Sequence, residues 1–152
     1  MSDVSPPALL GLEQVEDRLT EPEPLCLVLL AVEPRSAGEG TPWQPATALV
    51  EAITGRLRAA MRPYDELRLL ADGRFVLILP TLASTDDLRR SVTRLFEAVD
   101  APYPMAGTEL RTRTLLGAGV RTPGESPAEF LGRIVAAVDA ARDSDGHHPV
   151  LV

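Results

Sequence analysis

The sequence predicts an α+β domain with a mixed central β-sheet and flanking helices. Strand-like and helix-like patterns follow one another in the order strand, helix, hairpin, helix, strand, helix and short strand, which a sheet with helices packed on one face would satisfy. The dipeptide Asp72-Gly73 lies between two apolar runs, which is the strongest local signal for a β-hairpin. A continuous apolar run, Leu25 to Val32, indicates a strand covered on both faces. Because strand–helix–strand crossovers lie on both sides of the hairpin, we expect parallel and antiparallel pairs in one sheet, centred on the hairpin and on Leu25–Val32.

The first half of the chain supplies a helix and the hairpin. Apolar residues recur at helical spacing after a loop rich in proline and glycine, which predicts a helix from Ala46 to Met61. The helix ends before Pro63, because proline disfavours the α region for the residue that precedes it. The hairpin then joins Leu67–Ala71 to Arg74–Leu79. A type I′ turn between these strands would require positive φ at both Asp72 and Gly73.

The second half of the chain predicts a strand between two capped helices. Ser84 begins the first of these helices, whose apolar stripe continues to Val99. Glu109 to Arg121 is β-like, and two glycines within it either weaken the strand or mark a close approach of another backbone. Ser126 opens the last helix with a capping box. The final apolar run, Pro149 to Val152, predicts a short edge strand.

Composition and charge limit the classes of function. The chain has 152 residues, which favours one domain, and a formal net charge of −7 at pH 7. Residues 1–24 hold six acidic residues and one arginine, a net charge of −5, so we expect an acidic leader with a short N-terminal helix there and the main domain over residues 25–152. This balance argues against a surface that follows nucleic-acid phosphates, and no apolar run approaches the roughly 20 residues of a membrane helix. The single cysteine, Cys26, excludes an intramolecular disulfide and fits a reducing compartment, so we expect a cytoplasmic protein.

Residues 62–80 carry a recognisable spacing. They read Arg62-Pro63-Tyr64-Asp65, five residues, a five-residue turn, and an apolar strand that ends in Pro80. This pattern resembles the GGDEF domains of bacterial diguanylate cyclases, which read R-x-x-D, five residues, G-G-D-E-F and an apolar strand ending in proline. Weaker matches follow the family order over nearly the whole chain, and the resemblance implies the nucleotide-cyclase-like fold of that family. The residues of the degenerate signature turn are Ala71, Asp72, Gly73, Arg74 and Phe75.

Departures from the family pattern imply that catalysis is lost. In active members two divalent cations bridge the GTP phosphates and activate the attacking hydroxyl. By the resemblance, the positions of their carboxylate ligands look like Ala31 and Arg74, and the acid linked to deprotonation of the hydroxyl becomes Gly73. Only Glu33 keeps a carboxylate, and one such ligand does not hold Mg²⁺, while Pro34 has no N–H to offer a phosphate. We therefore expect no bound metal, no cofactor and no enzymatic activity.

The R-x-x-D motif itself is retained, and in the family it is the inhibitory site at which cyclic di-GMP binds. The resemblance implies that Arg62 contacts a phosphate and a guanine edge, while Asp65 accepts hydrogen bonds from guanine N–H groups. Guanidinium and carboxylate chemistry suits both roles. The family often adds an arginine from the following helix; Thr93 stands at that position, and the adjacent Arg94 and Arg90 are further candidates. The first hypothesis is therefore a catalytically inactive receptor of cyclic di-GMP in bacterial signalling.

Two other readings stay open. Arg62 and Asp65 are also explained by a salt bridge at a helix end, because R-x-x-D is short and frequent by chance. The domain would then be a nucleotide-independent scaffold that binds a signalling protein, or a second copy of itself as a homodimer. The acidic leader and the loop around Trp43 are the surfaces suspected for that role. An enzyme that converts GTP with unusual ligands is disfavoured by the loss of the acids named above.

Overall fold

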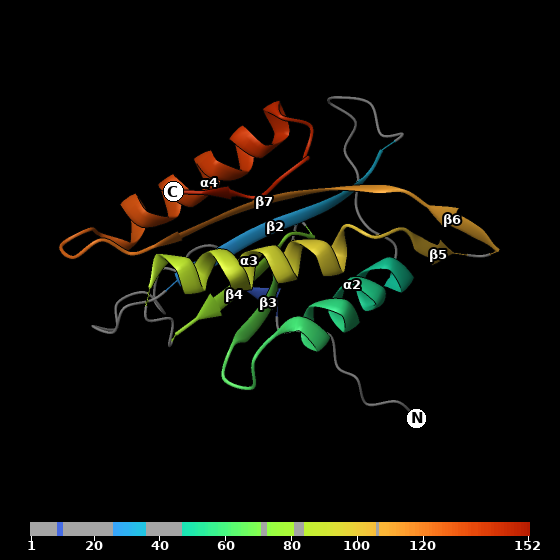
Figure 1. Cartoon of the computed structure of the whole chain (residues 1–152), viewed down its shortest axis with the longest axis horizontal. Helices are drawn as coiled ribbons and strands as arrows, with labels where there is room; N and C mark the ends of the chain where they lie inside the picture. The colour runs from blue at the N-terminus through green and yellow to red at the C-terminus, as the bar shows by residue number, and fades with distance from the viewer. Residues whose placement is uncertain (1–8, 11–25, 36–46, 71–72, 81–83, 106) are drawn as a thin grey trace.

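The computed structural model describes residues 9–10, 26–35, 47–70, 73–80, 84–105 and 107–152 (Figure 1). The elements are, in chain order, β1 (Leu9–Leu10), β2 (Cys26–Pro34), α2 (Thr47–Ala60), β3 (Glu66–Leu70), β4 (Phe75–Leu79), α3 (Thr85–Val99), β5 (Tyr103–Met105), β6 (Thr108–Leu110), β7 (Thr112–Val120), α4 (Pro127–Asp143) and β8 (Val150–Leu151). The predicted order of the main elements is confirmed. Three strands were not predicted as separate elements: β1 falls in the expected leader, and β5 and β6 form a small hairpin of their own.

Six strands form one mixed sheet in the order β1-β3-β4-β2-β7-β8. The inner pairs are antiparallel, and the two outer pairs, β1 with β3 and β7 with β8, are parallel. The strand β2 lies in the middle, where Leu30 pairs with Phe75 of β4 on one side and with Leu116 of β7 on the other. The predicted α+β class, with a mixed sheet centred on β2 and the hairpin, is therefore confirmed.

Helices cover both faces of this sheet, so the expectation of helices on one face is wrong. The helices α2 and α3 pack on one face and α4 packs on the other (Figure 1). Alternate residues of β2 supply the two cores: Val28 and Leu30 face α2 and α3, while Leu27 and Leu29 face α4. Because side chains of a strand alternate between faces, an unbroken apolar run already indicates cover on both sides.

The predicted capping serines both cap their helices. The Ser84 hydroxyl oxygen accepts a hydrogen bond of 3.1 Å from the Asp87 backbone N–H at the start of α3. The Ser126 hydroxyl oxygen accepts one of 3.1 Å from the Glu129 N–H at the start of α4. These bonds satisfy backbone donors that have no partner within the helix.

The helix α4 lies very close to β7. The sequence predicts such a close approach at the two glycines of this strand. A Cβ atom on Gly117 would lie 2.7 Å from the Cβ of Ala137 and 2.8 Å from the carbonyl oxygen of Ile134. A Cβ atom on Gly119 would lie 2.8 Å from the carbonyl oxygen of Val152. The glycines therefore allow both the helix and the end of the chain to pack against the sheet.

The β3–β4 hairpin is confirmed, but its loop is longer than predicted. The Leu70 N–H donates to the Arg74 carbonyl oxygen at 2.7 Å, and the Gly73 N–H donates to the Leu70 carbonyl oxygen at 3.0 Å. This pairing belongs to a three-residue loop that ends in a left-handed glycine, and Gly73 has φ 89°. The two-residue type I′ turn is therefore wrong, because Gly73 closes the loop instead of standing in the middle of a shorter one.

Some predictions concern residues outside the described ranges. These are the short N-terminal helix, the signature-turn residues Ala71 and Asp72, and the loop around Trp43. Among the helices that the structure describes, none is both long and apolar enough to cross a membrane.

Candidate functional site

Ala31 and Arg74, the two positions expected to have lost metal ligands, lie beside each other. The β2–β4 register pairs Leu30 with Phe75, so Ala31 and Arg74 are the next residues along the two strands. Ala31 is buried in the core against α4, and its side chain has no atom that could bind a metal. Within the described residues, no group of three or more His, Cys, Asp or Glu side chains could hold a metal ion.

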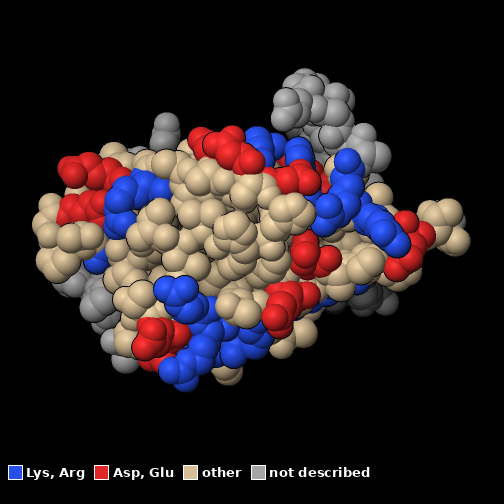
Figure 2. Space-filling model, turned by 45° about the horizontal axis from the view of Figure 1, so that its top comes forward, with Lys and Arg blue, Asp and Glu red and all other residues tan. Residues whose placement is uncertain are grey.

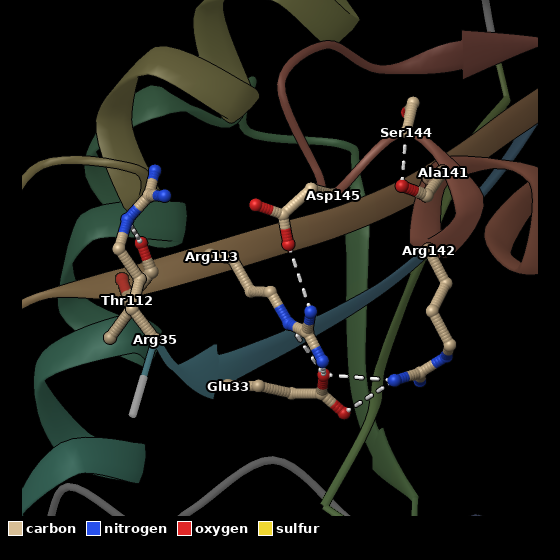
Figure 3. Close-up of polar contacts among 8 residues, drawn as sticks. All are labelled: Glu33, Arg35, Thr112, Arg113, Ala141, Arg142, Ser144 and Asp145. Carbon is tan, nitrogen blue, oxygen red and sulfur yellow. Dashed lines mark hydrogen bonds and ion pairs between the residues drawn. The ribbon is translucent and has the colours of Figure 1, made fainter. Parts of the chain in front are cut away.

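Glu33, the carboxylate that remains near this position, is held by two arginines (Figure 3). Its Oε1 atom lies 3.1 Å from a terminal nitrogen of Arg113 and 3.0 Å from one of Arg142. Arg142 also donates to Oε2 at 3.1 Å, and Arg113 donates to Oδ1 of Asp145 at 2.9 Å. This Glu33 cluster (Glu33, Arg113, Arg142 and Asp145) thus joins β2, β7 and the C-terminal end of α4.

The charges of the Glu33 cluster stabilise one another. Burial alone would lower the pKa of Arg113, but hydrogen bonds and charge from Asp145 and Glu33 outweigh burial and raise it. The Arg113 side chain is 14% exposed, so these interactions are partly shielded from water. An arriving cation would have to compete with two guanidinium groups for the carboxylate of Glu33.

Arg62 and Asp65 close the turn between α2 and β3. The Arg62 backbone N–H donates to Oδ2 of Asp65 at 2.9 Å, and the Asp65 N–H donates to the Arg62 carbonyl oxygen at 3.1 Å. The side chains also approach each other, with 3.7 Å between Nε of Arg62 and Oδ2 of Asp65. The structural reading of R-x-x-D as a local ion pair at a helix end therefore accounts for part of this geometry.

Several polar atoms of the same two side chains make no hydrogen bond within the described residues. Nε and Nη2 of Arg62 and Oδ1 of Asp65 are buried and make no hydrogen bond. The Asp65 side chain is 3% exposed, whereas that of Arg62 is 29% exposed. The Arg62 guanidinium lies 5.3 Å from the ring of Tyr64, which is one of the most exposed large apolar side chains described. Buried polar groups without partners are costly, so these atoms indicate unused binding capacity.

Arg94 lies close to the R-x-x-D turn and Arg90 extends from the same face of α3. Nε of Arg94 donates to the carbonyl oxygen of Ala60, the last residue of α2, at 2.9 Å. Arg90 stands one turn earlier on α3, is exposed, and approaches Asp87 at 3.9 Å. The structure therefore brings Arg94 to the end of the helix that precedes Arg62, while Arg90 points to solvent. On the face shown in Figure 2, basic and acidic side chains alternate in small groups.

Sequence reasoning missed the partners of Glu33. No local sequence pattern pairs Glu33 with Arg113 or Asp145. The register of β2 and β7 aligns Glu33 with Arg113. Eighty residues separate these two in sequence, so only a strand pairing that the sequence did not specify could have revealed the contact.

Comparison with solved structures identifies the fold. The GGDEF domain of YfiN (also called TpbB) from Pseudomonas aeruginosa superposes with a TM-score of 0.69 at 22% identity, covering 92% of this chain and 89% of that chain. The diguanylate cyclase SiaD from Pseudomonas aeruginosa, in complex with its activator SiaC, gives 0.72 at 20% identity over 93% of this chain and 55% of that chain. DgcB from Caulobacter crescentus, comprising the coiled coil and GGDEF domain in complex with c-di-GMP, gives 0.62 at 16% identity over 93% and 74%. No family model matches the sequence, and no curated protein matches it significantly.

The chain therefore has the fold of GGDEF domains. The resemblance that rested on R-x-x-D, the signature turn and the order of weaker motifs is confirmed at the level of the fold.

Proposed function

We propose that this GGDEF-fold domain is a catalytically inactive, cytoplasmic receptor of cyclic di-GMP that binds through Arg62 and Asp65. The observation that carries the proposal is the set of buried polar atoms on these two side chains that make no hydrogen bond within the described residues. A similar fold, DgcB, has been solved in complex with c-di-GMP, so the fold is compatible with this ligand.

The R-x-x-D turn offers complementary groups for a guanine nucleotide. One carboxylate oxygen of Asp65 is fixed by the Arg62 backbone N–H, which leaves Oδ1 to accept a bond from a guanine N–H group. Nε and Nη2 of the Arg62 guanidinium make no hydrogen bond within the described residues, although Nε lies 3.7 Å from Oδ2 of Asp65, and both can donate to a phosphate or a guanine edge. Because these nitrogens are buried, binding requires the Arg62 side chain to turn outward. The exposed ring of Tyr64 then offers a surface for base stacking, which contributes about 1–3 kcal/mol per base.

The charged residues near Ala31 support the proposed lack of catalytic activity. Glu33 is bound by Arg113 and Arg142, and the neighbouring strand position carries Arg74. Two-metal phosphoryl transfer needs several carboxylates close together to bring cations to the phosphates. Arginines at these positions oppose the binding of divalent cations by charge repulsion.

Calorimetry with cyclic di-GMP tests the receptor proposal. Wild type is expected to bind in the micromolar range, since two or three charge-assisted hydrogen bonds of about 1.5–3 kcal/mol each, with stacking, reach that affinity. Arg62→Ala should weaken binding at least about tenfold, because it removes more than one charge-assisted bond. The matched control is Arg111→Ala, an exposed arginine at the other end of the sheet. Wild type without any heat of binding at tens of micromolar ligand contradicts the proposal.

A protein-binding scaffold is the second candidate. The specific observation is that the similar fold of SiaD has been solved with its activator protein SiaC. This candidate predicts that cyclic di-GMP gives no calorimetric response and that capture of a signalling partner survives Arg62→Ala. Light scattering of the purified protein separates this candidate from self-association, because a homodimer doubles the measured mass.

A further inference from the structure

A hollow lies at the end of β2 that is far from Arg62. Its volume is about 290 Å³, which is at the lower limit for sites that bind small molecules. It is formed where the C-terminal ends of α3 and β2 meet the start of β7. The lining residues are Arg35, Asp100, Pro102, Arg111 and Thr112. Arg62 lies near Cys26 at the other end of β2, so the nine residues of this strand, roughly 30 Å, separate the two regions.

Two arginines supply positive charge to this hollow. The Arg35 backbone N–H donates to the Arg111 carbonyl oxygen at 3.1 Å, which fixes the two residues beside each other. Nε of Arg35 donates to the Thr112 carbonyl oxygen at 3.1 Å (Figure 3), so the guanidinium is oriented while its two terminal nitrogens keep their donors. The exposed Arg111 guanidinium makes no hydrogen bond or ion pair within the described part of the chain.

Two of the lining residues, Asp100 and Thr112, carry buried oxygens that lack hydrogen-bond donors within the described residues. Oδ1 of Asp100 and Oγ1 of Thr112 are buried and have no hydrogen-bond partner. Asp100 also stands at the C-cap of α3, where the helix dipole disfavours a negative charge. No ion pair joins Asp100 to Arg35 or Arg111, although all three line one hollow. Neither oxygen improves the stability of the unliganded fold, because a buried polar atom without a partner costs free energy.

We propose that this hollow binds a small phosphate ester that carries an amine. The two guanidinium groups match a phosphate dianion, the Thr112 hydroxyl adds a hydrogen bond to it, and the Asp100 carboxylate matches the ammonium group. The site is independent of the R-x-x-D turn, and its ligand differs from a cyclic dinucleotide in carrying a cationic nitrogen. We expect the phosphate ester to be a free small molecule, because several elements line the hollow and it holds only a few ligand atoms.

Phosphorus NMR titration with phosphoethanolamine tests the site. The resonance should broaden and shift with wild type, and inorganic phosphate should bind at least about fivefold more weakly because it lacks the ammonium group. Asp100→Ala should abolish this preference while retaining the weaker binding of phosphate. Arg35→Ala with Arg111→Ala should remove the binding of both probes. The protein should not co-sediment with phosphatidylethanolamine vesicles. Co-sedimentation would show that the ligand is a lipid headgroup and not the proposed free ester.

A stability measurement separates a binding role from a structural one. Thr112→Val and Asp100→Ala should leave the melting temperature unchanged or raise it, since each removes an unpartnered oxygen, while both weaken binding of phosphoethanolamine. A fall in melting temperature without any change in binding overturns the proposal, as does wild type that gives no response to millimolar phosphoethanolamine. Arg62→Ala should bind phosphoethanolamine as wild type does, so failure of the cyclic di-GMP proposal leaves this test intact.

Discussion

Glu33 and Arg113 are direct partners in the register of β2 and β7, and their side chains form an ion pair of 3.1 Å on the α4 side of the sheet. The last carboxylate near the expected metal position is therefore engaged in holding β2, β7 and α4 together. Its neighbours Arg142 and Asp145 extend the same contact to the end of α4. A residue that the family resemblance relates to catalysis has become part of the packing between the helix and the sheet.

Removal of Arg113 should lower stability without creating activity. Arg113→Met is expected to reduce the free energy of unfolding by about 1.5 kcal/mol, because charge-assisted hydrogen bonds to Glu33 and Asp145 are lost. The control Arg111→Met, at an exposed position that forms no ion pair with any described residue, should change it by less than about 0.5 kcal/mol. Urea denaturation measures both values. Incubation of either variant or of wild type with GTP and Mg²⁺ or Mn²⁺ should yield no dinucleotide, and chromatographic detection of one would contradict the proposed inactivity.

Gly117 should tolerate no side chain. Gly117→Ala places a Cβ within 2.8 Å of the α4 backbone, so we expect a loss of about 2–4 kcal/mol as the helix is displaced. The matched control is Gly132→Ala on the same helix, where a Cβ would meet nothing within 4 Å. That change should stabilise the protein by about 0.5–1 kcal/mol, because alanine favours helix more than glycine does. Equal effects of the two substitutions in thermal denaturation would argue against this packing of α4.

Glu125 should contribute stability that depends on acid pH. The side-chain hydrogen bonds from Arg133, at 2.7 and 2.9 Å, lower the pKa of Glu125 to about 2, while burial opposes the change. Because the folded pKa lies below that of the unfolded chain, the stabilisation is complete above about pH 5 and is lost as the pH falls towards 2. Glu125→Gln should therefore be less stable than wild type at neutral pH, by about 1 kcal/mol, with the difference vanishing near pH 2.

The control for this titration is Glu129→Gln, which changes an exposed carboxylate in the first turn of α4 that forms no ion pair with Arg133. Its stability should follow that of wild type across the acid range. A constant difference between wild type and Glu125→Gln from neutral pH down to pH 2 would show that the Glu125 charge is not responsible.

Tyr103 should ionise only at strongly alkaline pH. Burial raises the pKa of Tyr103 to about 12, although the nearby Arg56 guanidinium, 3.7 Å from the ring centre, lowers it. In Tyr64→Phe, where Tyr103 is the remaining tyrosine, phenolate absorbance should titrate near 12 and return to about 10 in denaturant. Since the folded state prefers the neutral phenol, stability should fall as the pH rises from about 10 through 12. A midpoint near 10 in protein that circular dichroism shows to be folded would contradict this result.

Local patterns predicted most of the fold because their causes are local. The Asp72-Gly73 dipeptide placed the hairpin, and the serines at 84 and 126 placed two helix starts within a residue. The loop was predicted one residue too short. A glycine with positive φ is typical of both two-residue and three-residue hairpin loops, so the dipeptide does not distinguish between them. The strand β5 was missed because it holds Pro104, and proline within a short run argues against a strand.

Non-local contacts could not be predicted in the same way. Bonded partners in the Glu33 cluster are separated by up to 109 positions, and no periodicity relates them. The hollow beside Asp100 likewise depends on where the end of α3 meets β7. For R-x-x-D, the spacing of Arg62 and Asp65 from the turn is visible in the sequence, but only the structure shows which of their polar atoms make hydrogen bonds and which do not.

The central position of β2 has a consequence for synthesis on the ribosome. This nine-residue strand pairs with β4 on one edge but with β7 on the other, and β7 ends at Val120. Until that segment has left the exit tunnel, a nascent chain carries one edge of its most apolar strand without a partner, a state that favours aggregation. Translation must therefore proceed through β7 before the middle of the sheet can close.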